Sequence, residues 1–401
     1  MDEDKESIFL ELQSAIEMLR KNYLSTNNKT VSEEEMVRNG LAAMLATLGD
    51  PFTNYIPPDQ LTSYQARKAQ QIVGVGLVSE FDREGKARIV AALESSPAFE
   101  SGMPVGAEIF RINGRNIRKT SSQLLANSLN GPEGSTVDIE LIMDSGETAS
   151  FQMQRRSVNV EYVRFQLIDP SILFIRIAWF SGTCYQELID QLGKHIESGV
   201  KGIVLDVRTN SGGSMISTRN IFSAFCDQEV MYYCRKTEDE KIKDKILGQH
   251  YFNLPIVLIL NEQTFSAGEI LAGSLKDYGR AKLVGRRSGG KGSMQQVFPL
   301  EGRIAGALRI TTATNCTPEG YVIQGNGVEP DIEVEQDLSE LFVDDGAQNY
   351  ARDGREYLKV LRSEKLAMIH GRERVEQVLG QGDKQKKCAI ETLRAEITKG
   401  Q

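Results

Sequence analysis

The apolar run from Pro255 to Leu260 predicts a β-strand buried on both faces, because it is short, rich in β-branched residues and free of charge. After Asn261 the spacing becomes helical, with apolar or small residues at Ile270, Leu271, Ser274, Leu275 and Tyr278. Gly279 follows, where a helix end favours a left-handed residue. The pattern therefore predicts a strand, a turn that contains Ser266, and a helix.

Hydrophobic patterning also divides the chain into parts. Amphipathic helical spacing covers residues 8–23 and 33–48, and short alternating strands with Gly-containing turns cover about 71–157. Strands and helices alternate from about 158 to 336, and a polar, helix-prone stretch follows. We expect a multidomain α/β protein with a helical N-terminal segment (1–70), a β-rich domain (71–157), an α/β domain (158–336) and a helical, charged C-terminal tail (337–401).

The predicted position of Ser266 suits a nucleophile. Free N–H groups and the helix dipole favour negative charge at a helix N-terminus, so they can stabilise an oxyanion there. Lys291 lies 25 residues later among Gly289, Gly290 and Gly292, which allow close backbone approach. A lysine acts as a base only if burial lowers its pKa well below about 10.4. The plain alternative is a helix-capping serine and a solvated lysine.

Three sequence blocks favour the catalytic interpretation. The chain reads Asn261-Glu-Gln-Thr-Phe-Ser-Ala-Gly-Glu-Ile270, then Leu271-Ala-Gly-Ser-Leu-Lys-Asp-Tyr-Gly-Arg-Ala281, then Val284-Gly-Arg-Arg-Ser-Gly-Gly-Lys-Gly-Ser-Met-Gln295. This order resembles the carboxyl-terminal processing peptidases, or tail-specific proteases, which are serine proteases with a Ser/Lys dyad. The resemblance implies Ser266 as nucleophile, Lys291 as general base and Gln295 as the residue that orients the lysine. It also implies a Clp protease/crotonase-like α/β core.

Further blocks are similar to the same family. Ile203-Val-Leu-Asp-Val-Arg-Thr-Asn-Ser-Gly-Gly213 is a buried strand followed by a glycine turn, and 311–334 resembles the family's closing segment. The resemblance implies an oxyanion hole formed by the amide of Ala267 and that of a turn glycine, with Gly212 as first choice and Gly213 as second.

The β-rich region resembles an inserted PDZ domain. Its characteristic pieces are Gly74-Val75-Gly76-Leu77, the stretch 96–114 that ends in Ile-Asn-Gly, and the turn Gly131-Pro-Glu-Gly134. A PDZ domain binds an extended peptide as an added strand and holds its C-terminal carboxylate with loop amides. The resemblance implies that Gly74, Val75, Gly76 and Leu77 are this loop.

The chain departs from the family pattern near the site. Phe265 stands where a small residue is usual and Gly268 where a serine is usual. The lysine loop has Arg286, Arg287 and Gly289 in place of an acidic residue and an aromatic, which favours a more mobile loop or one that binds acidic groups. Asn130 replaces an arginine that precedes the Gly-Pro-x-Gly turn in many members, which puts coupling between peptide binding and activation in doubt.

Composition limits the remaining possibilities. A net charge of −8 without a basic stripe argues against nucleic acid as a partner, and no run of residues reaches the ~18 apolar residues of a membrane span. The five cysteines form no Cys-x-x-Cys motif, which argues against structural zinc. We expect no metal and no cofactor. The start of the chain shows no signal segment, but the family resemblance implies a periplasmic or otherwise extracytoplasmic location, with a leader trimmed.

We therefore expect an ATP-independent serine endopeptidase that binds C-terminal tails of proteins and forms an acyl-enzyme. Its expected partners are flexible substrate tails, a second copy of the chain in a homodimer, and an adaptor or activator. Two alternatives are a protease-shaped binding protein without activity and a Ser/His hydrolase of small esters, which would need His195 or His250 near Ser266.

Overall fold

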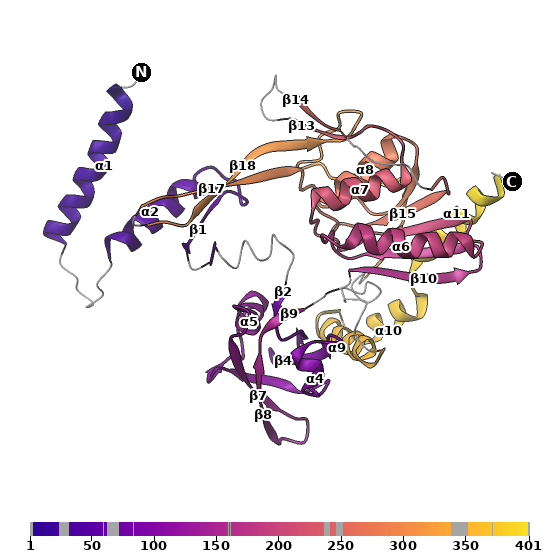
Figure 1. The fold of residues 1–401 in the computed structure, drawn as a ribbon, viewed down its shortest axis with the longest axis horizontal. Coiled ribbons are helices and arrows are strands. Elements are labelled where there is room, and N and C mark those ends of the chain that lie inside the picture. Colours follow the sequence, from indigo (N-terminus) through magenta and orange to yellow (C-terminus); the bar gives the residue numbers. More distant parts are fainter. Residues whose placement is uncertain are drawn as a thin grey trace. The chain divides into compact units, whose positions relative to one another are not determined.

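The computed structural model describes residues 3–23, 32–58, 60–61, 72–82, 84–158, 160, 162–235, 241–245, 252–302, 304–337, 352–370 and 372–399 (Figure 1). The chain divides into a smaller unit, formed by residues 1–59 and 297–310, and a larger unit, formed by residues 60–296 and 311–401.

The smaller unit begins with two helices, α1 (Glu3–Asn22) and α2 (Glu33–Ala46). The Ser32 hydroxyl accepts a hydrogen bond from the Glu35 N–H (3.1 Å) and so caps α2. Strand β1 (Asn54–Ile56) pairs with the first residues of β18 (Ala307–Cys316), which also pairs with β17 (Ser293–Pro299). The helical spacing of residues 8–23 and 33–48 therefore forms helices as predicted.

A six-stranded sheet forms the centre of the larger unit. Its order is β10 (Val163–Asp169), β11 (Ile172–Ile177), β12 (Gly202–Asp206), β15 (Ile256–Leu260), β16 (Ala281–Gly285) and β19 (Ile332–Glu333). All neighbours are parallel except β10 and β11. Every residue of β12 and β15 is buried, as expected of parallel strands covered on both faces.

Helices cover both faces of this sheet. One set of strand residues, which includes Leu205 and Leu258, packs with α6 (Cys184–Glu197), α7 (Met215–Phe225) and α8 (Ala267–Asp277). The alternate set, which includes Val204 and Val257, packs with α11 (Lys384–Lys399). Because successive strand side chains point to opposite faces, these two clusters define a three-layer arrangement. The predicted α/β class is confirmed.

The larger unit contains further strands and helices outside this sheet. Strand β13 (Val230–Arg235) pairs with β14 (Lys241–Lys245) and with the last residues of β18. Helix α9 (Arg352–His370) packs on α10 (Arg372–Gln381) through Leu366, Val375 and Val378.

Residues 72–158 form a β-rich region with its own core. Its main sheet has the order β3 (Leu77–Phe81), β4 (Ala87–Ala92), β5 (Glu108–Ile112), β7 (Thr136–Ile142) and β8 (Thr148–Gln154), with β6 (Arg115–Asn116) paired to β5. Strands β2 (Ile72–Gly74) and β9 (Arg156–Val158) form a separate pair, and α4 (Pro97–Glu100) and α5 (Ser122–Leu129) join the core. Among the described strands, β3 pairs with β4 alone, so its other edge has no partner there.

Candidate active site

Ser266 occupies a strained turn between β15 and α8. Its backbone has φ 56° and ψ −119°, which is uncommon for a residue with a side chain, and α8 begins at the next residue. Such a residue costs about 1–3 kcal/mol and persists only where its surroundings impose the conformation. A serine on a sharp strand-to-helix turn is the arrangement of a nucleophile elbow.

Buried hydrogen bonds impose this conformation. The Thr264 hydroxyl donates to the carbonyl oxygen of Val207 (2.8 Å), and the Phe265 N–H donates to the carbonyl oxygen of Asn210 (2.8 Å). Val207 and Asn210 follow β12, so the serine turn is fastened to the end of the neighbouring strand. The parallel pairing of β12 and β15 therefore brings two sequence blocks about 50 residues apart to one edge of the sheet.

The buried carboxylate of Glu269 joins the serine turn to the lysine loop. Its Oε2 accepts hydrogen bonds from the backbone N–H groups of Ser266 and Lys291, each at 2.8 Å. Its Oε1 accepts from the Gly290 N–H and the Ser288 hydroxyl, each at 2.6 Å. Burial raises the pKa of Glu269, and these four hydrogen bonds oppose that shift. The structure thus links the backbones of Ser266 and Lys291 through one carboxylate oxygen.

Sequence reasoning missed Glu269. The signal was present, because a glutamate three residues after a serine that precedes a helix is the spacing of a capping box. Here, however, the carboxylate also bonds a loop that lies more than 20 residues away, which no local pattern reveals.

Close backbone packing surrounds Lys291, which is half-buried. A Cβ placed on Gly290 would lie 3.2 Å from Gly325 and Gly327 backbone atoms, and one on Gly292 would lie 2.4 Å from the Gln324 nitrogen. The glycines around the lysine therefore allow the close approach that the sequence indicated. Gln295 lies on β17, and its amide donates to the Ser293 hydroxyl (2.9 Å) and the Thr311 hydroxyl (3.2 Å).

The glycine turn after β12 lies directly against Ser266. A Cβ placed on Gly212 (φ 111°) would be 2.8 Å from the Ser266 Cβ and 3.1 Å from its Oγ. The Gly212 N–H donates to Asn210 Oδ1 (2.8 Å), whereas the N–H groups of Gly213 and Ala267 donate to no acceptor in the described part of the chain. Among the described residues these two N–H groups are therefore available as donors, one on the residue after Ser266 and one on the residue after Gly212.

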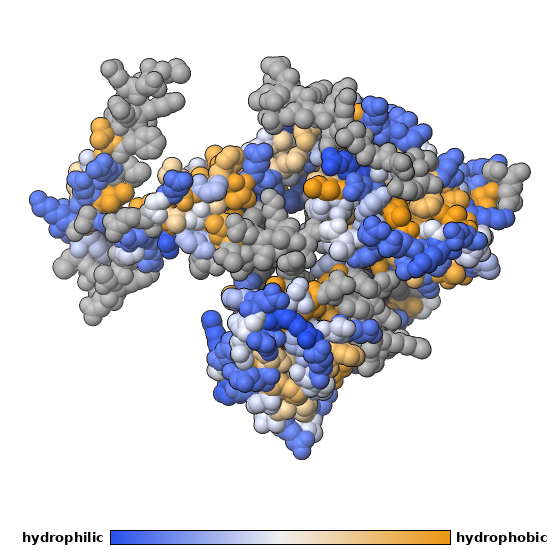
Figure 2. Space-filling view, in the orientation of Figure 1, coloured by the Kyte–Doolittle hydropathy of each residue, from blue (hydrophilic) through white to orange (hydrophobic). Residues whose placement is uncertain are grey.

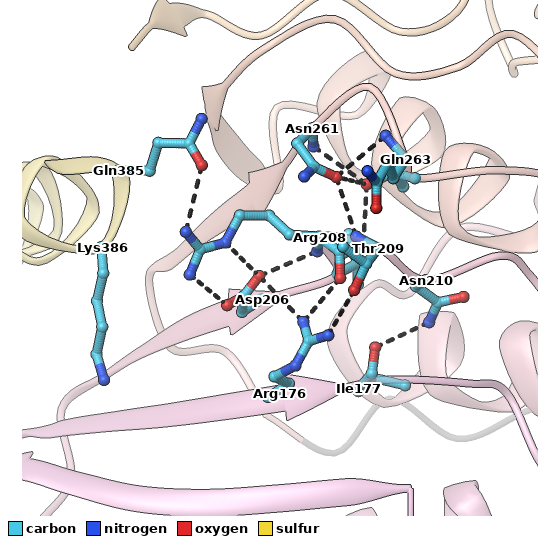
Figure 3. Close-up of polar contacts among 12 residues, drawn as sticks. Arg176, Ile177, Asp206, Arg208, Thr209, Asn210, Asn261, Gln263, Gln385 and Lys386 are labelled. Carbon is cyan, nitrogen blue, oxygen red and sulfur yellow. Dashed lines mark hydrogen bonds and ion pairs between the residues drawn. The ribbon is translucent and has the colours of Figure 1, made fainter. Parts of the chain in front are cut away.

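A buried ion-pair network supports the glycine turn (Figure 3). The Arg208 guanidinium donates to both oxygens of Asp206, as Figure 3 shows. Through two nitrogens it also donates to both oxygens of Asp383 at 2.8–2.9 Å. Arg176 donates to the carbonyl oxygen of Arg208 and to the hydroxyl of Thr209, each at 2.8 Å. Asp206, Arg208 and Arg176 are almost fully buried, so the residues before the turn are held by charges that water does not screen.

The pKa shifts of this network follow from its geometry. Burial alone would raise the pKa of Asp206, but the adjacent charges of Arg208 and Arg176 outweigh it and lower that pKa. Asp206 and Asp383 together raise the pKa of Arg208 against its desolvation. Both groups therefore remain charged. Asp383 immediately precedes α11, 175 residues after Arg208, and sequence reasoning gave no sign of the pairing.

The arginines of the lysine loop have partners within the chain. Arg286 forms an ion pair with Glu335 (2.8 Å), and Arg287 lies 3.6 Å from a Glu329 oxygen. His195 is on α6 with its ring stacked on Phe165, and His250 lies outside the described residues. No cluster of three or more His, Cys, Asp or Glu side chains that could hold a metal occurs in the described ranges.

The predicted peptide-binding loop lies between β2 and β3. Val75 is fully buried, Gly76 has φ 75°, and the N–H groups of both donate to no acceptor within the described residues. Asn130 lies against this loop, because a Cβ placed on Gly74 would be 2.3 Å from the Asn130 Oδ1. None of the helices described is long and apolar enough to cross a membrane.

Comparison with known proteins places the site in context. A sequence model for peptidase family S41 matches residues 171–334, which include both Ser266 and Lys291. The chain is 31% identical to a carboxyl-terminal-processing protease of Synechocystis sp. over 80% of its length and 75% of the relative's. It is 26% identical to the carboxy-terminal processing protease CtpA of Bacillus subtilis, over 82% and 70% of the two chains.

A solved structure has the same fold. The photosystem II D1 C-terminal processing protease superposes with a TM-score of 0.51 and 24% identity, covering 78% of this chain and 85% of that one.

Proposed function

Because the chain belongs to the carboxyl-terminal-processing peptidases of family S41, which are serine peptidases, we propose that it is an ATP-independent endopeptidase with Ser266 as nucleophile and Lys291 as general base. The observation that carries this proposal is the Glu269 carboxylate, whose one oxygen binds the backbones of both residues. An enzyme needs its nucleophile and base held in fixed relative positions, and this buried carboxylate supports such a role.

The proposed reaction proceeds through an acyl-enzyme. The unprotonated Lys291 amine takes the proton of the Ser266 hydroxyl as Oγ attacks the scissile carbonyl carbon. The tetrahedral intermediate then expels the amine of the peptide, which receives the proton from Lys291 and leaves an ester on Ser266. Water gives a proton to Lys291 and attacks the ester, and Ser266 leaves as it regains that proton. Gln295 would orient the lysine.

The oxyanion needs two donors beside Ser266. We propose the N–H of Ala267 for one, supported by its position as first residue of α8 and its lack of an acceptor among described residues. For the other, the hydrogen bond from Gly212 to Asn210 favours Gly213 over Gly212 in this conformation. Gly212 would serve if the Asn210 side chain turned away.

The β-rich region is proposed to be a PDZ domain that binds the C-terminal end of a substrate. The edge of β3 that has no partner among the described strands supports this, because a peptide can add to it as a further strand, beside α5. The N–H groups of Val75 and Gly76 have no acceptor among the described residues, so they suit a terminal carboxylate. The Leu77 amide would complete the loop, with Gly74 as its start. Substrates would then be flexible C-terminal tails of proteins.

The assembly and location belong to the same proposal. Figure 2 shows patches of orange surface on the N-terminal helices. The exposed large hydrophobic residues on these helices or just after them are Leu10, Met18, Leu19, Tyr23, Met44 and Leu48. A second copy would cover them, which supports a homodimer. An extracytoplasmic location and an adaptor or activator rest on the family resemblance. Sedimentation equilibrium of the full chain and of a Met18→Glu/Leu19→Glu variant tests the dimer.

Digestion of an unstructured protein tests the activity. We expect the wild type to cleave it, and Ser266→Ala and Lys291→Ala to lower the rate at least about 10⁴-fold while circular dichroism stays unchanged. Lys282→Ala, which removes an exposed lysine, should cleave like the wild type. Amidation of the substrate's C-terminus should raise KM. Cleavage that survives in Ser266→Ala would refute the assignment, and binding without cleavage by the wild type would favour the inactive binding protein.

A further inference from the structure

Phe265, the residue before Ser266, places its ring on the lysine loop. A Cβ placed on Gly289 would lie 1.9 Å from Phe265 Cε1 and 2.5 Å from its Cδ1 and Cζ, and these are the three nearest atoms. No real Cβ approaches another atom so closely, so the ring occupies the space that a side chain at residue 289 would need. Phe265 itself is half-buried.

The backbone of Gly289 does not require glycine. Its φ lies outside the left-handed region that other residues avoid, unlike that of Gly290 (φ 82°). Gly292 differs in another way, because the obstacle to its Cβ is the backbone of Gln324 and Ile323. At residue 289 the nearest obstacle is a side chain. The ring of Phe265 and the missing side chain of Gly289 therefore form a complementary pair.

Contact between Phe265 and Gly289 limits how closely the serine turn and the lysine loop can approach each other, which the hydrogen bonds between them do not fix alone. The hydrogen bonds of Glu269, and that from the Gly289 N–H to the carbonyl oxygen of Thr264 (3.0 Å), draw the serine turn and the lysine loop together. A ring in van der Waals contact limits how closely they approach, and an aromatic side chain has only two rotatable bonds. The backbone N–H of Phe265 meanwhile bonds the glycine turn at Asn210.

We propose that Phe265 is a positioning residue for the Ser266/Lys291 pair, in which its ring, seated on Gly289, sets the spacing between the serine turn and the lysine loop. This inference rests on the proposed function, because the spacing matters only if the two side chains react together. A misplacement of about 1 Å can lower a rate about 10²-fold, so a spacer of this size is sufficient to control activity.

A double-mutant cycle tests the pair. The variants are Phe265→Ala, which removes the ring; Gly289→Phe, which adds a second ring; and the double variant, which moves the ring from one side of the contact to the other. The readouts are the rate at which a fluorophosphonate labels Ser266, kcat and KM for an unstructured substrate, and the midpoint of thermal unfolding. Phe265→Tyr keeps the ring and serves as the conservative variant.

We expect each single variant to lose at least about tenfold in labelling rate and kcat, with KM changed less than about threefold. The double variant should recover to within about threefold of the wild type, because the two changes share one contact. Phe265→Tyr should keep wild-type rates. Gly268→Ala is the matched control, since its Cβ would meet Thr264 at 3.0 Å and not Phe265. Adding Phe265→Ala to the Gly268→Ala variant should not restore any labelling rate or kcat that Gly268→Ala loses.

The outcomes separate this inference from the proposed function. Additive losses in the double variant, or full labelling of Phe265→Ala, would overturn the positioning role while the wild type still cleaves. Loss of thermal stability that fully accounts for the loss of labelling would also overturn it. A wild type that neither cleaves nor reacts with the fluorophosphonate, together with an equally inert Ser266→Ala, would overturn both proposals.

Discussion

Arg208, at the end of a central strand, and Asp383, at the start of the C-terminal helix α11, form a two-point ion pair across 175 residues of sequence. Arg208 is 1% exposed, so its charge depends on Asp383 and Asp206 for compensation. The docking of α11 on one face of the sheet is thereby linked to the strand end that carries the glycine turn. This connection makes a distant helix part of the support of the candidate active site.

Asp383→Asn should therefore destabilise the protein. We expect a loss of about 1–3 kcal/mol in the free energy of unfolding, because a buried guanidinium loses a charged acceptor. Glu396→Gln is the control, since it removes a more exposed ion pair between α11 and Lys282 and should cost under about 1 kcal/mol. Urea denaturation of both variants measures the difference, and equal losses would contradict the central role of Asp383.

Stability should fall in acid because of Asp206. Its pKa is lowered in the folded state, so its contribution is fully present above the unfolded pKa of about 3.9 and is lost as pH falls through the folded pKa. Urea denaturation between pH 6 and pH 3 should show a decline that is flatter in Asp206→Asn, which is less stable at pH 6. Parallel curves for the two proteins would show that Asp206 does not control the transition.

Glu269→Gln should inactivate the enzyme. The amide keeps the size of the carboxyl group but replaces one acceptor oxygen with a donor, so at least one of the three backbone N–H groups that bond the carboxylate loses its acceptor. Each buried donor left without an acceptor costs about 1–3 kcal/mol. We expect labelling of Ser266 by a fluorophosphonate to slow at least about 10²-fold. Asp331→Asn, which alters a half-exposed carboxylate outside the site, should label at the wild-type rate.

Gly212→Ala should abolish activity. It has two effects, a steric clash with Ser266 and backbone strain, and a control variant that has only the strain separates them. The new Cβ would lie 2.8 Å from that of Ser266, and φ 111° strains any side chain. Gly320→Ala shares the second cost, with φ 90°, but no atom lies within 4 Å of its Cβ. Both variants should lose stability, whereas only Gly212→Ala should lose cleavage. Activity in Gly212→Ala would mean that the turn can move away from the serine.

The sequence predicted the local elements of the site well. The apolar run 255–260 forms β15, the helix begins directly after Ser266, and Gly279 has φ 61° at its end. These features depend on periodicity and on backbone preferences that a single stretch carries. The order of the glycine turn, serine and lysine blocks likewise indicated the family correctly.

Contacts between distant segments could not be predicted in the same way. The two departures at Phe265 and Gly289 were read separately from the sequence, and the structure shows that one side chain fills the space left by the other. The partner of Arg208 comes from α11, and Glu269 bonds a loop beyond its own helix. Such pairings depend on which distant segments pack together, and the local patterns of a single sequence do not reveal those contacts.

The positive φ of Ser266 has a consequence for the choice of an inactive variant. Alanine at this position keeps the strained backbone, whereas glycine adopts positive φ without cost, so Ser266→Gly should be at least as stable as Ser266→Ala despite glycine's greater freedom in the unfolded chain. Thermal unfolding of the two variants checks this. A clearly lower midpoint for the glycine variant would show that the strain is small.

The turn at Ser266 fixes the direction of the side chain at this position through the backbone, independently of which reactive group the side chain carries. The Thr264 hydroxyl, the Phe265 N–H and the Glu269 carboxylate hold the turn, and the bond from Ser266 to that carboxylate comes from its backbone N–H. The bonds around the turn therefore set the orientation of the Cα–Cβ bond of residue 266, whatever nucleophilic group follows it. Another small nucleophile at residue 266, such as the thiol of a cysteine, would have the same orientation, so this turn could position a nucleophile of different reactivity.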